Sequence, residues 1–259
     1  MSIKIYMSLS FKKSLDQIPR TYNGYPSVTS ILSVIEDPSY IKKWKANAED
    51  ESVVDKVINT ARKRGTYVHL VASNYYKTGR MSVDEDELMK FKNEYGLPDI
   101  DSKVYRLLNG FNKFISQEEV IPFSVEEPLI SSKLKVAGTP DIIGSFRQKL
   151  SIIDWKTSSS ARISDDLMLK YLIQSSVYAA MWNLERPDNK IEQIVIVPLT
   201  HSRSNGLGEI KIEDSKKIIQ NYFLQFLECR EQFLKLWKSH ASYPQGREIL
   251  NCPHKQVME

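Results

Sequence analysis

The 259-residue sequence predicts an α/β domain in which helices flank a central mixed β-sheet, with a helical region at the N-terminal side. Three observations predict this fold class. Apolar residues recur at helical spacing before residue 118, β-branched segments separated by polar turns occupy residues 120–157, and helical spacing returns in residues 213–239. Apolar residues make up 41% of the chain and charged residues 26%, which excludes a long disordered protein and fits one large domain over residues 1–259.

The first part of that domain, residues 25–118, is expected to be helical. Residues 1–24 are an irregular lead-in that can add a strand, and Ser27 is a suitable N-cap for a helix with an apolar face. Residues 51–77 predict one long helix or two, in which Gly65 marks either a kink or a close approach to a neighbouring element. Residues 105–115 predict a further helix.

Residues 78–103 interrupt these helices and have a different composition. They contain the acidic run from Asp84 to Glu87, and Gly79 and Gly96 punctuate the segment. We expect a flexible insertion, either a helix or a loop.

The sheet is expected within residues 119–240. The predicted strands are 121–130, 134–145, 150–156 and 191–199, with a hairpin turn near 144–149; the predicted helices are 165–184 and 213–239. Residues 241–259 are polar and predict a loose tail.

Charge and cysteine content limit the function classes. A formal charge of +4, from 36 basic and 32 acidic residues, permits nucleic-acid binding without indicating it. Cys229 and Cys252 are too few for a four-thiolate iron–sulfur cluster or a four-cysteine zinc site. Apolar runs are too short to cross a bilayer, and no secretory or transit pattern opens the chain. We expect a cytoplasmic protein of a bacterium or phage-infected cell, with the mitochondrial matrix as the alternative and no membrane partner.

The chemistry is concentrated in two short motifs, Gly138-Thr-Pro-Asp141 and Asp154-Trp-Lys156. Residues two apart on a strand share a face, so Asp154 and Lys156 point the same way, and Asp141 can meet them from the preceding strand. Two carboxylates and an ammonium group suit a Mg²⁺ or Mn²⁺ site that activates water against a phosphodiester. A lone Asp-x-Lys occurs about once by chance in a chain of this length, and an exposed salt bridge is the alternative reading.

Two further pairs accompany these motifs along the chain. Gly65 and His69 lie on the long predicted helix, and Gln174 and Tyr178 lie four residues apart on the helix after Lys156, so that they share a face. Taken alone, His69 is better explained as a core histidine, and a polar helix face is the alternative reading of Gln174 and Tyr178.

The ordered set of four motifs resembles the RecB-like branch of the PD-(D/E)XK nuclease superfamily, which includes the mitochondrial genome maintenance exonuclease and related phage and bacterial exonucleases. The resemblance covers roughly residues 25–240. It implies a restriction-endonuclease-like core. It also implies a metal site of His69, Asp141, Asp154 and the Trp155 carbonyl, and catalytic roles for Asp141, Asp154, Lys156, Gln174 and Tyr178. Glu127 matches an acidic position before the Gly-x-x-Asp strand and is either a supporting residue or simply exposed.

The same resemblance implies DNA as the partner. Residues 78–103 correspond to a region that covers single-stranded DNA in such exonucleases, and the acidic run there can discourage duplex entry. Basic and aromatic residues near the motifs can contact phosphates and bases. The candidate nucleic-acid contacts are Trp44, Arg62, Arg64, Arg162 and Lys170.

We therefore expect a metal-dependent deoxyribonuclease, an exonuclease acting on single-stranded DNA or DNA with a free end, in replication, repair or recombination. A structure-specific or restriction-like endonuclease is the first alternative, because the same catalytic residues serve both. A catalytically silent DNA-binding protein is the second. No helicase phosphate-binding motif is present in the chain, so any motor or recombination protein would be a separate partner.

Overall fold

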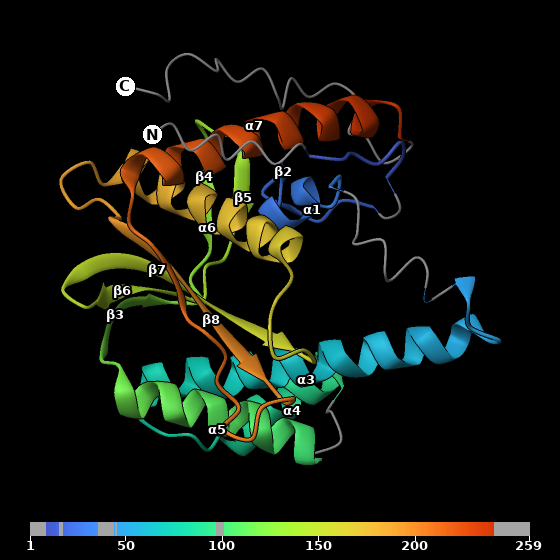
Figure 1. The fold of residues 1–259 in the computed structure, drawn as a ribbon. Coiled ribbons are helices and arrows are strands. Elements are labelled where there is room, and N and C mark those ends of the chain that lie inside the picture. The colour runs from blue at the N-terminus through green and yellow to red at the C-terminus, as the bar shows by residue number, and fades with distance from the viewer. Residues whose placement is uncertain (1–8, 16–17, 36–43, 45, 97–100, 241–259) are drawn as a thin grey trace.

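The computed structural model describes residues 9–15, 18–35, 44, 46–96 and 101–240. Its centre is a five-stranded sheet in the order β3-β6-β7-β8-β9 (Figure 1). Its strands are β3 (Val120–Val125), β6 (Ile142–Phe146), β7 (Lys149–Ser158), β8 (Gln193–Thr200) and β9 (Lys211–Glu213). Only β7 and β8 are parallel, and the other neighbours are antiparallel, so the sheet is mixed as predicted.

Helices cover both faces of this sheet (Figure 1). On one side lie α3 (Glu51–Thr78), α4 (Glu85–Tyr95) and α5 (Ser102–Gln117); on the other lie α1 (Val28–Leu32), α6 (Asp165–Glu185) and α7 (Lys216–Lys238). Two small sheets pair β1 (Thr21–Tyr22) with β2 (Tyr25–Pro26) and β4 (Leu129–Ser131) with β5 (Val136–Gly138). The α/β class and the helix-flanked mixed sheet are confirmed.

Strand β7 separates two hydrophobic cores. Ile152 belongs to the core under α6 and α7, whereas Ile153 and Trp155 belong to the core under α3 and α5. The Trp155 ring makes edge contacts with Phe111 and Phe114, at centroid distances of 5.3 and 5.0 Å. Because side chains alternate along a strand, burying Trp155 on one face turns Asp154 and Lys156 toward the other.

The predicted helix at 51–77 is a single helix, α3. Asp50 caps its N-terminus, and Gly79 ends it in the left-handed conformation with φ 75°. Gly65 lies within the continuous helix, and a Cβ there would come within 2.8 Å of Thr157 Oγ1 on β7. Of the two readings of Gly65, the close approach is therefore correct.

Two predicted strands, 121–130 and 134–145, were wrong in extent. Each divides into two strands that belong to different sheets, β3 with β4 and β5 with β6. Glu126, between β3 and β4, has a positive φ value of 52°, which no sequence alternation reveals. The short strand β9 was also missed, and α7 starts at Lys216 rather than at residue 213.

The segment 78–103 contains a capped helix, α4. Asp84 accepts a hydrogen bond from Glu87 N, and the acidic run fills the first turn. Carboxylates stabilise a helix N-terminus because the helix dipole is positive there. The acidic run therefore has a structural reason independent of DNA. The predicted tail at 241–259 lies outside the described residues.

One glycine contact tests how tightly the α5 layer is packed. A Cβ at Gly110 would lie 2.1 Å from the backbone oxygen of Gly206, which cannot rotate away. We expect Gly110→Ala to lower the free energy of unfolding by about 1–3 kcal/mol, although alanine is the better helix former. Denaturant unfolding measures the effect, and Asn109→Ala on the exposed side of α5 is the control, expected within about 0.5 kcal/mol of wild type. Equal stability of both variants would contradict the close contact.

Candidate active site

Asp141 is held by three different elements. It lies just before β6, where its Oδ1 is 3.2 Å from Nδ1 of His69 on α3. Its Oδ2 accepts a hydrogen bond of 2.8 Å from the backbone N–H of Trp155, and its carbonyl oxygen accepts one of 2.9 Å from Glu126 N. The carboxylate is thus fixed between α3 and β7 before any ligand binds.

Asp154 and Lys156 lie together on the α6 side of β7. Lys156 Nζ is 2.6 Å from Asp154 Oδ2 and donates a hydrogen bond of 3.2 Å to Gln174 Oε1. Nε2 of Gln174 in turn donates to the Tyr178 hydroxyl at 2.9 Å. The i, i+4 spacing on α6 therefore extends the chain of polar contacts that begins at Asp154.

Gly138 has a packing role in this arrangement. A Cβ at this position would lie 2.5 Å from Cε1 of Tyr178 and 3.2 Å from a methyl group of Val28. The glycine lets α6 bring Tyr178 against β5. The glycine of the Gly-x-x-Asp motif is thus explained by the close approach of the helix that carries Gln174.

Burial and mutual attraction set the charges of the site. Burial raises the pKa of Asp154 to about 6, against the lowering effect of Lys156. Burial alone would lower the pKa of His69, but the Asp141 carboxylate outweighs it and the pKa is raised. Burial opposes ionisation of Asp141, yet His69 and Lys156 hold its pKa below the ordinary value. The pKa of Lys156 is raised because Asp154 and Asp141 outweigh its burial, so the side chain is an ammonium at neutral pH.

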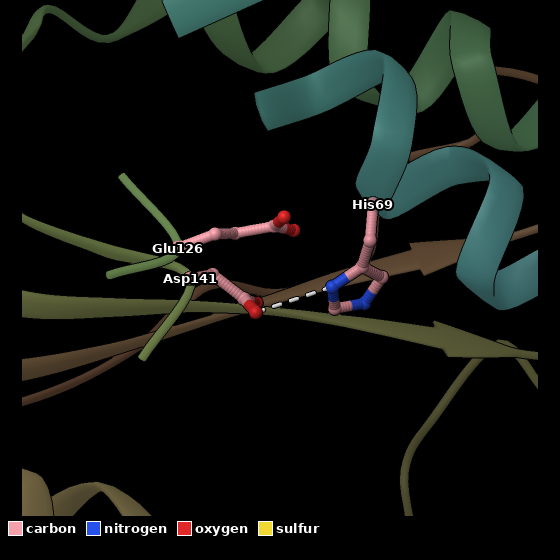
Figure 2. Close-up of side chains that lie close together, drawn as sticks. All are labelled: His69, Glu126 and Asp141. Carbon is pink, nitrogen blue, oxygen red and sulfur yellow. Dashed lines mark hydrogen bonds and ion pairs between the residues drawn. The ribbon is translucent and has the colours of Figure 1, made fainter. Parts of the chain in front are cut away.

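A third acidic residue, Glu126, converges on His69 and Asp141 (Figure 2). One ligand atom from each of these residues lies within 4.8 Å of the other two. The acidic residue that reaches the site is therefore Glu126 and not its neighbour Glu127, which is exposed and accepts a hydrogen bond from Ser124 Oγ at 3.1 Å.

The backbone explains why sequence reasoning selected the neighbouring residue. The ladder between β3 and β6 shifts register between Pro122 and Ser124, and Glu126 then adopts φ 52°. Simple alternation along the strand cannot place a side chain beyond such a bulge. No pattern in this single sequence marks the shift.

These donors fit a divalent cation. One imidazole nitrogen and carboxylate oxygens are ligand types that Mg²⁺ and Mn²⁺ accept. The Asp154 side chain is buried, and no described donor makes a hydrogen bond of ordinary geometry to its Oδ2, although the Lys156 ammonium is nearby. A cation beside Asp141 and Asp154 would compensate the burial of two carboxylates.

A cavity of about 1040 Å³ opens beside this group. His69, Glu126 and Asp141 line it at one side. Its other walls carry cations from the β1 side and from α3, and aromatic rings from α4. These are Arg20, Arg62, Lys63, Phe91 and Tyr95.

The residues predicted to contact nucleic acid lie in different parts of the structure. Arg62 lines the cavity, whereas Arg64 forms an ion pair with Asp101. Arg162 pairs with Asp165 on the surface of α6, and Lys170 acts electrostatically on Cys229 of α7. Trp44 is exposed. Among the residues described as lining the cavity, Arg62 is the one member of the predicted set.

The chain belongs to the PD-(D/E)XK nuclease superfamily, because the model of that family matches residues 42–254. This match confirms the superfamily that the motifs resemble, and it makes the protein a nuclease. PD-(D/E)XK nucleases use divalent metals, in agreement with the group formed by His69, Glu126 and Asp141.

Comparisons with other proteins add little to this assignment. A protein described as "Putative exonuclease" from Eubacterium rectale is 15% identical, with 83% of this chain and 77% of that chain covered and a TM-score of 0.45. The protein SSO0001 is 13% identical, with 76% and 84% covered and a TM-score of 0.28. No curated protein matches.

Within the part of the chain that the structure describes, no helix has both the length and the apolar composition to span a membrane.

Adjacent glutamates give a matched test of the site geometry. Glu126→Gln removes a charged oxygen beside His69 and Asp141, so the Mg²⁺ concentration for half-maximal nuclease activity should rise roughly tenfold to a hundredfold. Glu127→Gln, one residue away and exposed, should leave this concentration unchanged. Titration of activity with Mg²⁺ measures both. The opposite ranking of the two variants would place Glu127 in the site.

Proposed function

We propose that this nuclease is a Mg²⁺- or Mn²⁺-dependent deoxyribonuclease that degrades single-stranded DNA from a free end. The observation that carries the proposal is the convergence of His69, Glu126 and Asp141 at the wall of a cavity lined by cations. Phosphate groups are attracted to Arg20, Arg62 and Lys63. The phosphodiester to be hydrolysed would therefore be held next to the carboxylates of Glu126 and Asp141.

The metal would be held by His69, Asp141, Asp154 and the Trp155 carbonyl, with Glu126 as a direct or water-mediated ligand. When bound, it polarises a phosphate oxygen and lowers the pKa of a bound water. This set extends the predicted ligands by Glu126 and keeps each of the others.

Lys156 acts as a hydrogen-bond donor in this proposal. Its ammonium remains protonated at neutral pH because Asp154 and Asp141 stabilise the charge. It can therefore donate a hydrogen bond to the oxygen of the attacking water or to a non-bridging phosphate oxygen. Either contact offsets the negative charge that grows in the transition state. Gln174 fixes the position of Nζ, and Tyr178 fixes the amide of Gln174.

The cavity walls support a preference for single strands. Tyr95 on α4 is 46% exposed and lines the same cavity as the phosphate-attracting residues. Unpaired bases can stack on an exposed ring, whereas paired bases present no free face. Because Phe91, Glu94 and Tyr95 line the cavity, α4 supplies one wall of the proposed substrate path from within the insertion 78–103.

The RecB-like branch is part of the proposal, supported by the order of Gly65/His69, Gly138/Asp141, Asp154/Lys156 and Gln174/Tyr178. A role in replication, repair or recombination follows from the degradation of single strands at free ends. Replication or recombination proteins would be the partners.

Two alternatives remain distinguishable. A structure-specific or restriction-like endonuclease would use the same residues, but it would cut DNA that has no end. A silent DNA-binding protein is disfavoured because Asp154, Lys156 and Gln174 form a connected set of polar contacts rather than a disrupted one.

Cleavage of linear and circular single-stranded DNA tests the proposal. With Mg²⁺, wild type should degrade the linear strand and spare the circle. Lys156→Ala should lower the rate roughly a hundredfold to a thousandfold, as expected for loss of one transition-state donor. The matched control is Lys149→Ala, at the exposed start of the same strand, which should retain full activity. Cutting of the circle would establish an endonuclease, and full activity of Lys156→Ala would place the active site elsewhere.

A further inference from the structure

A second cluster of basic residues lies where β8 ends, beyond the cavity just described. It comprises Arg64 of α3, Lys103 and Arg106 of α5, and His201 in the turn after β8; we name it the His201 patch. Arg106 Nη1 donates a hydrogen bond of 3.0 Å to the carbonyl oxygen of His201. The patch is therefore assembled from three elements that are far apart in the sequence.

The four residues lie close enough to interact electrostatically. Partial burial lowers the pKa of His201, and the charges of Lys103, Arg64 and Arg106 lower it further. The Asp101 carboxylate raises the pKa of His201, but this carboxylate already has other partners. Its Oδ1 accepts the backbone N–H groups of Lys103 and Val104, and its Oδ2 pairs with Arg64. The patch consequently keeps an excess of positive charge.

The turn that carries His201 is built against α5. Gly206 has φ 73°, and a Cβ on it would lie 1.9 Å from the backbone oxygen of Arg106. Thr200 Oγ1 donates a hydrogen bond of 2.9 Å to the backbone oxygen of Ser160. These contacts fix the backbone from which the patch is built before a ligand arrives, which lowers the entropic cost of binding.

The patch is joined to the active site through β7 and β8. Ser158 pairs with Thr200 across these parallel strands, and His201 N donates to the Ser158 oxygen at 3.4 Å. A strand rises about 3.3 Å per residue and neighbours lie about 4.8 Å apart, which places His201 roughly 11 Å from Lys156. A distance of this size is spanned by a few nucleotides of one DNA strand.

We propose that the His201 patch binds a backbone phosphate of the DNA strand a few nucleotides from the scissile bond, an anchor separate from the cavity beside α4. The inference rests on the proposed function in taking DNA as the substrate. Arginine and lysine are the side chains that most often pair with phosphate.

Charge reversal in the patch tests the anchor. The variants are Lys103→Glu and Arg106→Glu. Arg147→Glu at the β6–β7 turn is the control of equal charge change at the other end of β7; it breaks an ion pair with Glu118 but leaves the patch intact. Among described residues, Lys103 has no side-chain hydrogen bond or ion pair, so its replacement removes charge without breaking a contact. The probe is a fluorescent single strand of about twelve nucleotides, and its anisotropy is followed in EDTA to prevent hydrolysis.

Both patch variants should bind the probe roughly tenfold more weakly than wild type at moderate salt, and Arg147→Glu should bind as wild type does. The slope of log affinity against log salt should fall by about 0.7 for the lost phosphate contact. Circular dichroism establishes that the variants are folded. Affinities and salt slopes equal to those of Arg147→Glu would overturn the anchor.

Cleavage of the same probe by wild type in Mg²⁺ separates this inference from the proposed function. Cleavage of the probe, together with unchanged probe affinity in both patch variants, would refute the anchor alone. Binding that depends on the patch without any cleavage would refute the deoxyribonuclease proposal and leave the anchor standing.

Discussion

The alternation of side chains along β7 is the constraint on which the rest of the structure depends. Trp155 is driven into the aromatic core formed by Phe111, Phe114 and Tyr76. Burying so large a ring stabilises the α3–α5 layer. Because side chains alternate along a strand, it also directs Asp154 and Lys156 to the opposite face of the sheet, toward α6. The same residue also donates its backbone N–H to Asp141. One hydrophobic anchor thus sets the position of three charged groups.

Holding these charges has an energetic cost that the surrounding contacts reduce. Asp154 is 2% exposed, and an isolated carboxylate in such a place would be strongly disfavoured. The Lys156 ammonium compensates part of the charge, and Gln174 satisfies the ammonium. Such buried ion pairs add little net stability, so their presence is better explained by the reaction than by folding. Burial raises the pKa of Asp154 because it disfavours the carboxylate charge, and a bound cation would stabilise that charge.

Sequence reasoning recovered the features that depend on short-range patterns. The helices near 165–184 and 51–77 follow from apolar spacing and capping residues, and the pairing of Asp154 with Lys156 follows from strand periodicity. The ordered motifs also indicated the superfamily, which the family model confirms. These signals are local in the chain, so one sequence is enough to find them.

Features that depend on tertiary geometry could not be found in this way. Glu126 enters the site through a register shift and a positive φ value, and the strand it belongs to breaks where alternation predicts continuity. Arg64 looks like a neighbour of Arg62 in the sequence, yet one points to Asp101 and the other lines the cavity. His201 belongs to no sequence motif, because the residues it interacts with lie on α3 and α5, far from it in the chain.

The most direct test of the metal-centred account is a crystal structure of the protein grown with Mn²⁺ and measured at the manganese absorption edge. We expect an anomalous peak beside the carboxylate of Asp141, within coordination distance of a His69 ring nitrogen and near Glu126 and Asp154. A peak elsewhere, or none at concentrations that support cleavage, would contradict it.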